Sequence, residues 1–244
     1  MISCSPSTPS QPFHLVSPSP WPLLLTISLL LTTLFFCLSL YFLRSSFFLI
    51  FFCSRICIIG FWLTDVVSEG THLGCHSLAV QSGLRLSIVL FILSEVMFFA
   101  SFFWAYLHCS LSPNVELGSL WPPAGISPLD CTSLPLLNTF VLLVSASTVT
   151  VSHSLLRTSF TNSSSFWLLA SVGLGIFFLL LQGLEYSLCS FTIADSSFGS
   201  CFFLATGFHG LHVLIGSIWL SVSLPRMLLG HYTSCRHFCL ESGI

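Results

Sequence analysis

The stretch from Gly83 to Cys109 constrains the fold of this chain most, because it is a long apolar run that contains a single acidic residue. A bilayer core about 30 Å thick needs about 20 apolar residues in a helix. Residues 86–107 meet that length, and Glu95, near their middle, is their only formally charged residue. The sequence therefore predicts a membrane-spanning helix that carries one carboxylate.

The carboxylate of Glu95 is the first candidate functional group. An ionised carboxylate is costly at that depth, so we expect Glu95 to be protonated near neutral pH or to face a polar partner inside a bundle. Its neighbours three and four residues along the helix are all apolar: Phe91, Ile92, Phe98 and Phe99. A partner must therefore come from another helix, a lipid head group or water. Two roles stay open, a neutral Glu bonded to a neighbouring helix and a proton relay.

The composition excludes an ordinary soluble domain. Hydrophobic residues make up 54% of the chain, charged residues 6%, and the mean hydropathy is +0.96, as in a polytopic α-helical membrane protein. The 6 basic residues, all Arg, face 8 acidic ones, so no basic surface for nucleic acid is expected. The 11 Cys form no CxxC pair, which argues against a zinc ribbon or a disulfide scaffold. The expected partners are lipid and other membrane helices.

Apolar runs predict an all-α transmembrane bundle with six spans: residues 22–43, 47–63, 86–107, 134–156, 166–189 and 201–224. The segments between and around them are an N-terminal tail (1–21), a polar connection (64–85), a Pro-rich loop (110–133) and a C-terminal tail (230–244). Residues 22–63 thus form one pair of helices, and residues 86–229 a four-helix bundle. Arg55, inside the second span, must snorkel, pair or face protein.

Polar side chains within the spans are expected to bond between helices. Gln182 and Glu185 lie one turn apart on one helix face, and His209 and His212 are three residues apart on the sixth span. The fourth span offers a larger set: Asn138, Ser145, Ser147, Thr148, Thr150, Ser152 and His153. No internal repeat is present in the sequence, which weakens a transporter with inverted repeats.

The distribution of Arg predicts the orientation. With six spans, four Arg residues fall on the side that also holds both termini: Arg85, Arg157, Arg226 and Arg236. The opposite side holds Arg44 alone. The positive-inside bias therefore places both termini on the matrix or cytoplasmic side.

Seven blocks of sequence, in order along the chain, match the pattern of one known family. They are VSPSPWPL (16–23), AVQSGLR (79–85), LFILSEVMFFASFFWAY (90–106), ELGSLWPPAGISPL (116–129), PLLNT (135–139), LLQGLEY (180–186) and FLATGFHGLHVLIGS (203–217). On these blocks the chain resembles subunit III of haem–copper cytochrome c oxidase, in its mitochondrial form. The resemblance covers nearly the whole chain.

The resemblance implies a non-catalytic core subunit of respiratory complex IV, a proton-translocating oxidoreductase. Such a subunit stabilises the redox subunits and supports proton uptake during electron transfer from cytochrome c to oxygen. It has no redox centre of its own, since haem a and copper belong to partner subunits. The implied partners are catalytic subunit I, subunit II, accessory subunits and membrane phospholipids, in the mitochondrial inner membrane with both termini on the matrix side.

The resemblance also implies a fold and a lipid site. Helices one and two would form a V, separated from the remaining bundle by a cleft that holds structural phospholipids. In the family, cleft lipids contact the residues that match Trp62, Glu69, His76 and Arg85, and the carboxylate that matches Glu95 reacts with hydrophobic carbodiimides. Thr64 and Ser68 stand where the family usually has Arg, so two expected phosphate ligands are missing.

The sequence stops at Ile244, where the family continues into a final span rich in Trp and Tyr. We expect a helix from a separate chain to fill the place of that span.

Three other functions would use the polar residues differently. A haem protein would use His209 and His212, but on one helix they point the same way, so one haem would need a second helix to supply its other ligand. A proton- or ion-coupled transporter would use Glu95 and Glu185. A zinc site would use two thiols and two imidazoles of the C-terminal tail: His231, Cys235, His237 and Cys239. Their spacing in the sequence is too short for a known zinc finger, so no metal site is expected.

Overall fold

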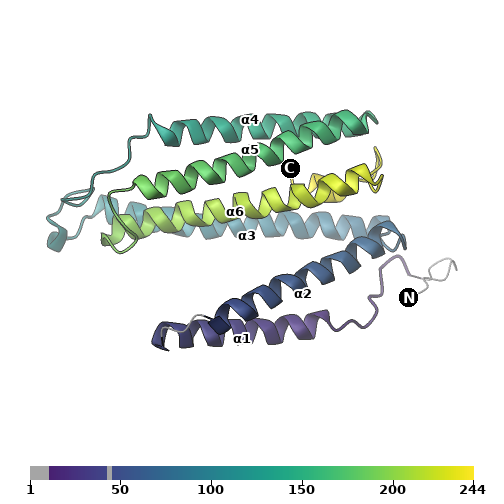
Figure 1. Cartoon of the computed structure of the whole chain (residues 1–244), viewed down its shortest axis with the longest axis horizontal. Coiled ribbons are helices and arrows are strands. Elements are labelled where there is room, and N and C mark those ends of the chain that lie inside the picture. The colour runs from purple at the N-terminus through teal and green to yellow at the C-terminus, as the bar shows by residue number, and fades with distance from the viewer. Residues whose placement is uncertain (1–10, 43–45) are drawn as a thin grey trace. The chain divides into compact units, whose positions relative to one another are not determined.

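The computed structural model describes residues 11–42 and 46–244, and the regular elements in that part of the chain are all helices (Figure 1). Residues 1–10 of the predicted N-terminal tail, and Arg44, lie outside the described residues. Within these described ranges six helices are long and apolar enough to cross a bilayer, which confirms the all-α fold and the predicted number of spans. They are α1 (Trp21–Phe42), α2 (Ser46–Thr71), α3 (Leu78–Leu111), α4 (Leu134–Arg157), α5 (Thr161–Leu188) and α6 (Ser196–Leu228), with the short η1 (Val115–Leu117) and α7 (Phe238–Glu241) between and after them.

Several helices are longer than the predicted spans. α2 continues to Thr71 and α3 begins at Leu78, so the polar connection expected over residues 64–85 narrows to residues 72–77. The 34 residues of α3 correspond to a length of about 50 Å, well beyond the hydrocarbon thickness of about 30 Å. A polar sequence ends the apolar run without ending the helix, because a helix satisfies its own backbone in water as well as in lipid.

The chain divides into two compact units, Met1–Leu84 and Arg85–Ile244, which are described separately. In the first unit α1 and α2 pack against each other through aromatic rings. Trp21 stacks on Phe61 with centroids 5.7 Å apart, and Phe35 stacks on Phe51 at 4.9 Å. These pairs make α1 and α2 an antiparallel hairpin.

Arg55 lies on α2 among apolar side chains. Its guanidinium carbon is 5.3 Å from the centroid of the Phe52 ring on the same helix. A cation over an aromatic face is one way to hold a charge near the membrane.

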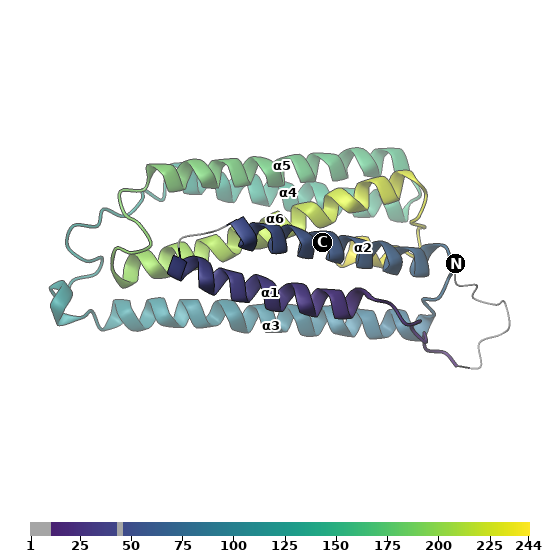
Figure 2. The ribbon, with the colours of Figure 1, turned by 60° about the horizontal axis from the view of Figure 1, so that its bottom comes forward.

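The second unit is organised around α5, which packs against α4 on one side and α6 on the other (Figures 1 and 2). The buried positions 164, 168, 171, 175 and 178 of α5 are spaced alternately four and three residues apart. Positions 138, 141, 145, 148 and 152 of α4 show the same spacing on its inner face. A repeat of 3.5 residues is typical of helices that cross at about 20° in a left-handed sense.

Hydroxyl groups join α4 to α5 along this interface. Ser152 Oγ donates to the carbonyl of Ser164 at 2.8 Å, and Ser164 Oγ donates to the carbonyl of Ser152 at 2.7 Å. Both serines are fully buried. Thr148 and Ser171 share a further hydrogen bond of 2.7 Å. The predicted interhelical role is therefore confirmed for Thr148 and Ser152, whereas two hydroxyls of the same set bond to carbonyls of their own helix: Ser147 and Thr150.

Close packing of α5 on α6 depends on a glycine. A Cβ atom at Gly175 would lie 2.5 Å from Ser217 Oγ, so a larger residue there would require Ser217 or one of the helices to shift. Farther along the same two helices, Tyr186 donates to Thr206 Oγ1 at 2.8 Å.

The C-terminal segment, expected as a tail over residues 230–244, packs into the second unit. Leu240 is 0% exposed and joins Tyr232 in a core cluster with residues of α4, α5 and α6. Trp219 Nε1 donates to the carbonyl of Cys239 at 2.8 Å. Burial raises the pKa of the Tyr232 hydroxyl. The segment is thus part of the packed structure.

Helix α3 contacts α6 through long side chains and has no buried residue. Phe98 and Phe102 pack on Phe208 of α6 with ring centroids 5.0 and 5.5 Å away. Most of the surface of α3 is therefore not covered by the second unit.

Candidate functional site

The carboxylate predicted in the third span meets an imidazole from the sixth. Glu95 Oε2 of α3 and His212 Nε2 of α6 are 2.7 Å apart, with side-chain exposures of 30% and 37%. The ring of Phe99 lies edge-on to His212 at 5.2 Å. The partner of Glu95 thus comes from another helix, as its apolar neighbours required.

The other ring nitrogen of His212 fixes the proton count of this pair. Nδ1 lies 2.6 Å from the carbonyl oxygen of Phe208, and because a carbonyl only accepts, Nδ1 carries a hydrogen. Nε2 and the Glu95 carboxyl then share one further proton. That proton makes either a neutral acid beside a neutral imidazole or a carboxylate beside an imidazolium. In both forms the net charge is zero, which lowers the cost of placing the pair within a membrane.

The two histidines of the sixth span make different contacts. Both nitrogens of His212 are engaged, one by Phe208 and one by Glu95. His209 turns instead toward α5, where its ring lies edge-on to Phe178 at 5.8 Å. His212 therefore has no imidazole nitrogen free for a haem iron.

The other predicted polar residues gather at a separate cavity between α4, α5 and α6. It measures about 590 Å³, and Gln182, Glu185 and His209 line it together with Asn138 and several Phe and Leu side chains. Asn138 Nδ2 donates to Glu185 Oε2 at 3.4 Å. Gln182 Nε2 is buried and has no hydrogen-bond partner among the described residues. The lining of this cavity is thus largely apolar, with a few polar groups.

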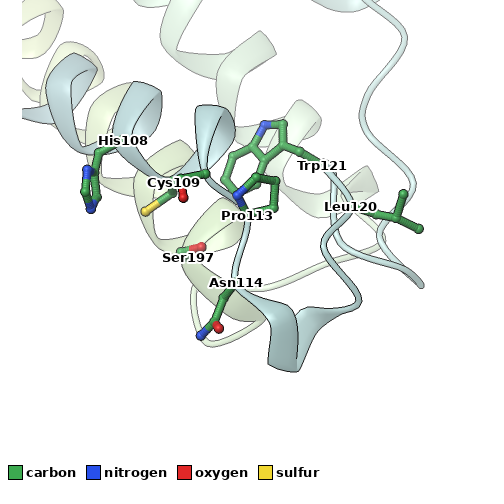
Figure 3. Close-up of a pocket in the computed structure, with 8 residues that line it drawn as sticks. His108, Cys109, Pro113, Asn114, Leu120, Trp121 and Ser197 are labelled. Carbon is green, nitrogen blue, oxygen red and sulfur yellow. The ribbon is translucent and has the colours of Figure 1, made fainter.

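A second cavity lies outside the predicted set, where α3 ends and α6 begins (Figure 3). It measures about 390 Å³, and its lining includes His108, Cys109 and Trp121. Trp121 packs edge-on to Tyr106 and Phe198, both at 5.5 Å. These contacts anchor the Pro-rich loop on the helices.

The residues expected to hold lipid are divided between the two units. In the first unit, His14 Nε2 lies 3.3 Å from Glu69 Oε2, and the rings of His14 and His76 are 6.3 Å apart. Burial lowers the pKa of His76, His14 lowers it further, and Glu69 opposes part of the shift. Trp62 lies two turns before Glu69 on the same face of α2.

Arg85, the fourth of these residues, belongs to the second unit. Its Nη2 lies 3.5 Å from Glu241 Oε2 of α7. Both side chains are exposed.

Two contacts of the first unit were missed in the sequence. His14 lies in the segment expected to be irregular, yet it pairs with Glu69 across 55 residues. Trp21 Nε1 donates to Asp65 across 44 residues. No periodicity links positions so far apart, so no pattern in the sequence signals either contact.

The Arg residues of the second unit gather at one of its ends. Arg85 contacts α7, Arg226 lies over a ring of the C-terminal segment, and Arg157 is in the last turn of α4. One turn before Arg157, His153 contacts His237 of the same segment at 3.0 Å. The grouping used to predict orientation is therefore present in the structure.

Comparison with known proteins finds one family along nearly the whole chain. The sequence profile described as cytochrome c oxidase subunit III matches residues 11–244. Cytochrome c oxidase subunit 3 of Podospora anserina is 49% identical over 237 residues, which cover 96% of this chain and 88% of that protein. The protein of the same name from Pongo abelii is 48% identical over 234 residues, which cover 96% and 90%. The matched range includes both Glu95 and His212.

Proposed function

This chain belongs to the cytochrome c oxidase subunit III family, and on that premise we propose that it is a non-catalytic subunit whose Glu95–His212 pair supports proton uptake by the oxidase. It is a subunit of a respiratory-chain oxidoreductase of the inner mitochondrial membrane. Membership of this family does not favour the transporter alternative. The partner subunits, I and II among them, would hold haem a and copper.

The observation that supports a proton role is the 2.7 Å contact between Glu95 and His212. A carboxyl group and an imidazole that share one proton can pass it between them with no change in the net charge of the pair, and His titrates closest to neutral pH. The pair can therefore hold one proton within the membrane and pass it between its two members while the net charge stays zero. Glu95 as the protonated partner stays a prediction.

The test is Glu95→Gln in the intact oxidase. The amide keeps the shape of the acid and a donor toward His212 Nε2, so we expect assembly to be unchanged and proton uptake to slow during sustained turnover. Glu116→Gln, in an exposed loop, is the matched control and should leave both unchanged. Equal proton uptake by the Glu95→Gln variant and the unaltered oxidase would exclude the proton role while leaving the structural role intact.

The non-catalytic role has its own test. The chain purified alone should show no haem band in a reduced-minus-oxidised spectrum. A stoichiometric haem signal would contradict the proposal.

We further propose that phospholipid head groups bind in the first unit at Glu69 and His76, with Trp62 at the interface, and that Arg85 of the second unit separately binds a lipid phosphate. Carboxylate, imidazole and guanidinium groups recognise amines and phosphates by charge-assisted hydrogen bonds. Mass spectrometry of lipid retained by the purified oxidase tests this. The variant Glu69→Ala should retain less phospholipid than the unaltered oxidase, and equal retention would contradict the site.

The end rich in Arg is proposed to face the matrix. Cys235, exposed at that end, should react with an impermeant maleimide only when the matrix side is open. Cys131, exposed just before the start of α4, should react from the opposite side. The reverse pattern would invert the topology.

A further inference from the structure

Three metal-binding side chains converge at the end of the second unit opposite the Pro-rich loop. His153 comes from α4, His237 directly precedes the single turn of α7, and Glu241 is the last residue of that turn. One ligand atom from each lies within 4.8 Å of the other two. His153 Nε2 is 3.0 Å from His237 Nε2, which in turn is 3.4 Å from Glu241 Oε1. None of these residues takes part in the proposed proton role.

The hydrogen bonding of His237 turns a lone pair toward the centre of this cluster. Its Nδ1 lies 2.9 Å from the carbonyl oxygen of Thr233 and must donate to it. A neutral His237 therefore presents an unprotonated Nε2 to His153 and Glu241. A backbone carbonyl that fixes the tautomer in this way is the usual outer support of a metal-bound His.

His153 Nε2 can donate a hydrogen to His237 Nε2 at 3.0 Å, but the contact of His237 with Glu241 then has no donor. Glu241 Oε1 and His237 Nε2 are both acceptors, yet they face each other at 3.4 Å. Only a proton on His237 or a bound cation makes that contact favourable. The His237 side chain is 4% exposed, so water does not supply the missing donor easily.

The separations fit a tetrahedral ion. Zinc bonds of about 2.0–2.1 Å to His nitrogen and carboxylate oxygen place neighbouring ligand atoms about 3.3 Å apart. The two measured separations, 3.0 and 3.4 Å, lie on either side of that value. The Glu241 side chain is 36% exposed and can turn to close the remaining gap to His153. Arg85 contacts the other carboxylate oxygen, Oε2, and leaves Oε1 for the ion.

We propose that His153, His237 and Glu241 bind one Zn²⁺ ion through Nε2, Nε2 and Oε1, with water as the fourth ligand. Two imidazoles and a carboxylate are a donor set that zinc accepts among the divalent metals. The ion fastens the C-terminal segment to the end of α4.

The experiment uses the intact oxidase, incubated with zinc chloride at pH 7.5, freed of unbound metal and analysed for zinc per complex. The variants His237→Gln and His153→Gln should each hold one zinc fewer than the unaltered oxidase. His108→Gln, an exposed His at the far end of α3, is the matched control and should lose none. Equal zinc in all four preparations overturns the site.

A second measurement does not depend on the variants assembling. Crystals of the unaltered oxidase soaked in zinc chloride should show an anomalous peak at the zinc edge about 2 Å from both Nε2 atoms. A map without that peak overturns the proposal.

Discussion

Removing His212 is expected to destabilise the contact of α3 with α6 by an amount that a double-mutant cycle can isolate. The perturbations are Glu95→Ala, His212→Ala and both together. Each single change leaves a polar group without its partner inside the membrane, at a cost of about 1–3 kcal/mol. The double variant removes both groups and should cost less than the sum of the two single changes.

The size of the coupling follows from the geometry. Hydrogen bonds between membrane helices average about 0.6 kcal/mol in such cycles and reach about 1.7. At 2.7 Å with two ionisable groups, this bond belongs near the upper end. The side-chain exposures of 30% and 37% keep it from exceeding that range. We therefore expect a coupling of about 1–1.7 kcal/mol, a factor of about 5–20 in the unfolding equilibrium.

The assay is reversible unfolding of the chain by SDS in mixed lipid–detergent micelles, followed by circular dichroism. The control cycle replaces Glu95 by its neighbour Ser94, whose hydroxyl bonds to the Phe91 carbonyl of its own helix at 2.6 Å. Ser94→Ala and His212→Ala should add to within about 0.3–0.5 kcal/mol. A coupling for Glu95 and His212 that is no larger than the control value would refute the reasoning.

Three further predictions use the same unfolding assay. Gly175→Ala places a Cβ atom 2.5 Å from Ser217 Oγ and should lower the free energy of unfolding by about 1–3 kcal/mol. Adding Ser217→Ala removes Oγ and leaves the Cβ of residue 217 at 3.6 Å, so most of the lost stability should return. If the second change recovers no stability, the close approach is contradicted. Ser152→Ala and Ser164→Ala should each lower the free energy of unfolding by about 0.5–1.5 kcal/mol. The double variant should lose less than the sum of these two values, because the two serines bond to each other. Strictly additive losses would argue against a hydrogen-bonded pair of serines. Burial lowers the pKa of His76 below its ordinary 6.5, so the folded chain binds this proton more weakly than the unfolded chain does. The free energy of unfolding should therefore fall as the pH drops from 6.5 through the lowered pKa, and it should fall less in His76→Gln. The same pH profile in both proteins would contradict the role of His76.

The spans were predictable because length and apolar composition alone decide whether a helix can cross a bilayer. The need for an interhelical partner of Glu95 was predictable for a similar reason, since its own helix offers apolar neighbours. The sequence did not predict which histidine contacts Glu95, because His209 and His212 share one side of α6. Their packing decides it: His212 meets α3, and His209 meets Phe178 of α5.

Contacts between distant, irregular segments were beyond the sequence. His153 and His237 are 84 residues apart, and the helix that holds Glu241 has 4 residues, too few to show a period. Leu240, completely buried, sits in a stretch whose polar residues suggested a tail. When a residue is buried because the chain turns back onto distant helices, the local composition does not predict that burial.

The hydroxyl and amide contacts between α4 and α5 bear on how this part of the chain enters the membrane. The two helices are joined by residues 158–160, so each is the first partner the other meets during synthesis. Alone in lipid, α5 would bring the Glu185 carboxyl into hydrocarbon, and α4 would bring Asn138. Released together as a hairpin, the helices enter the bilayer with Asn138 Nδ2 already bonded to the Glu185 carboxyl. We expect the insertion machinery to retain α4 until α5 has emerged, so that the hairpin, rather than the single helix, partitions into lipid.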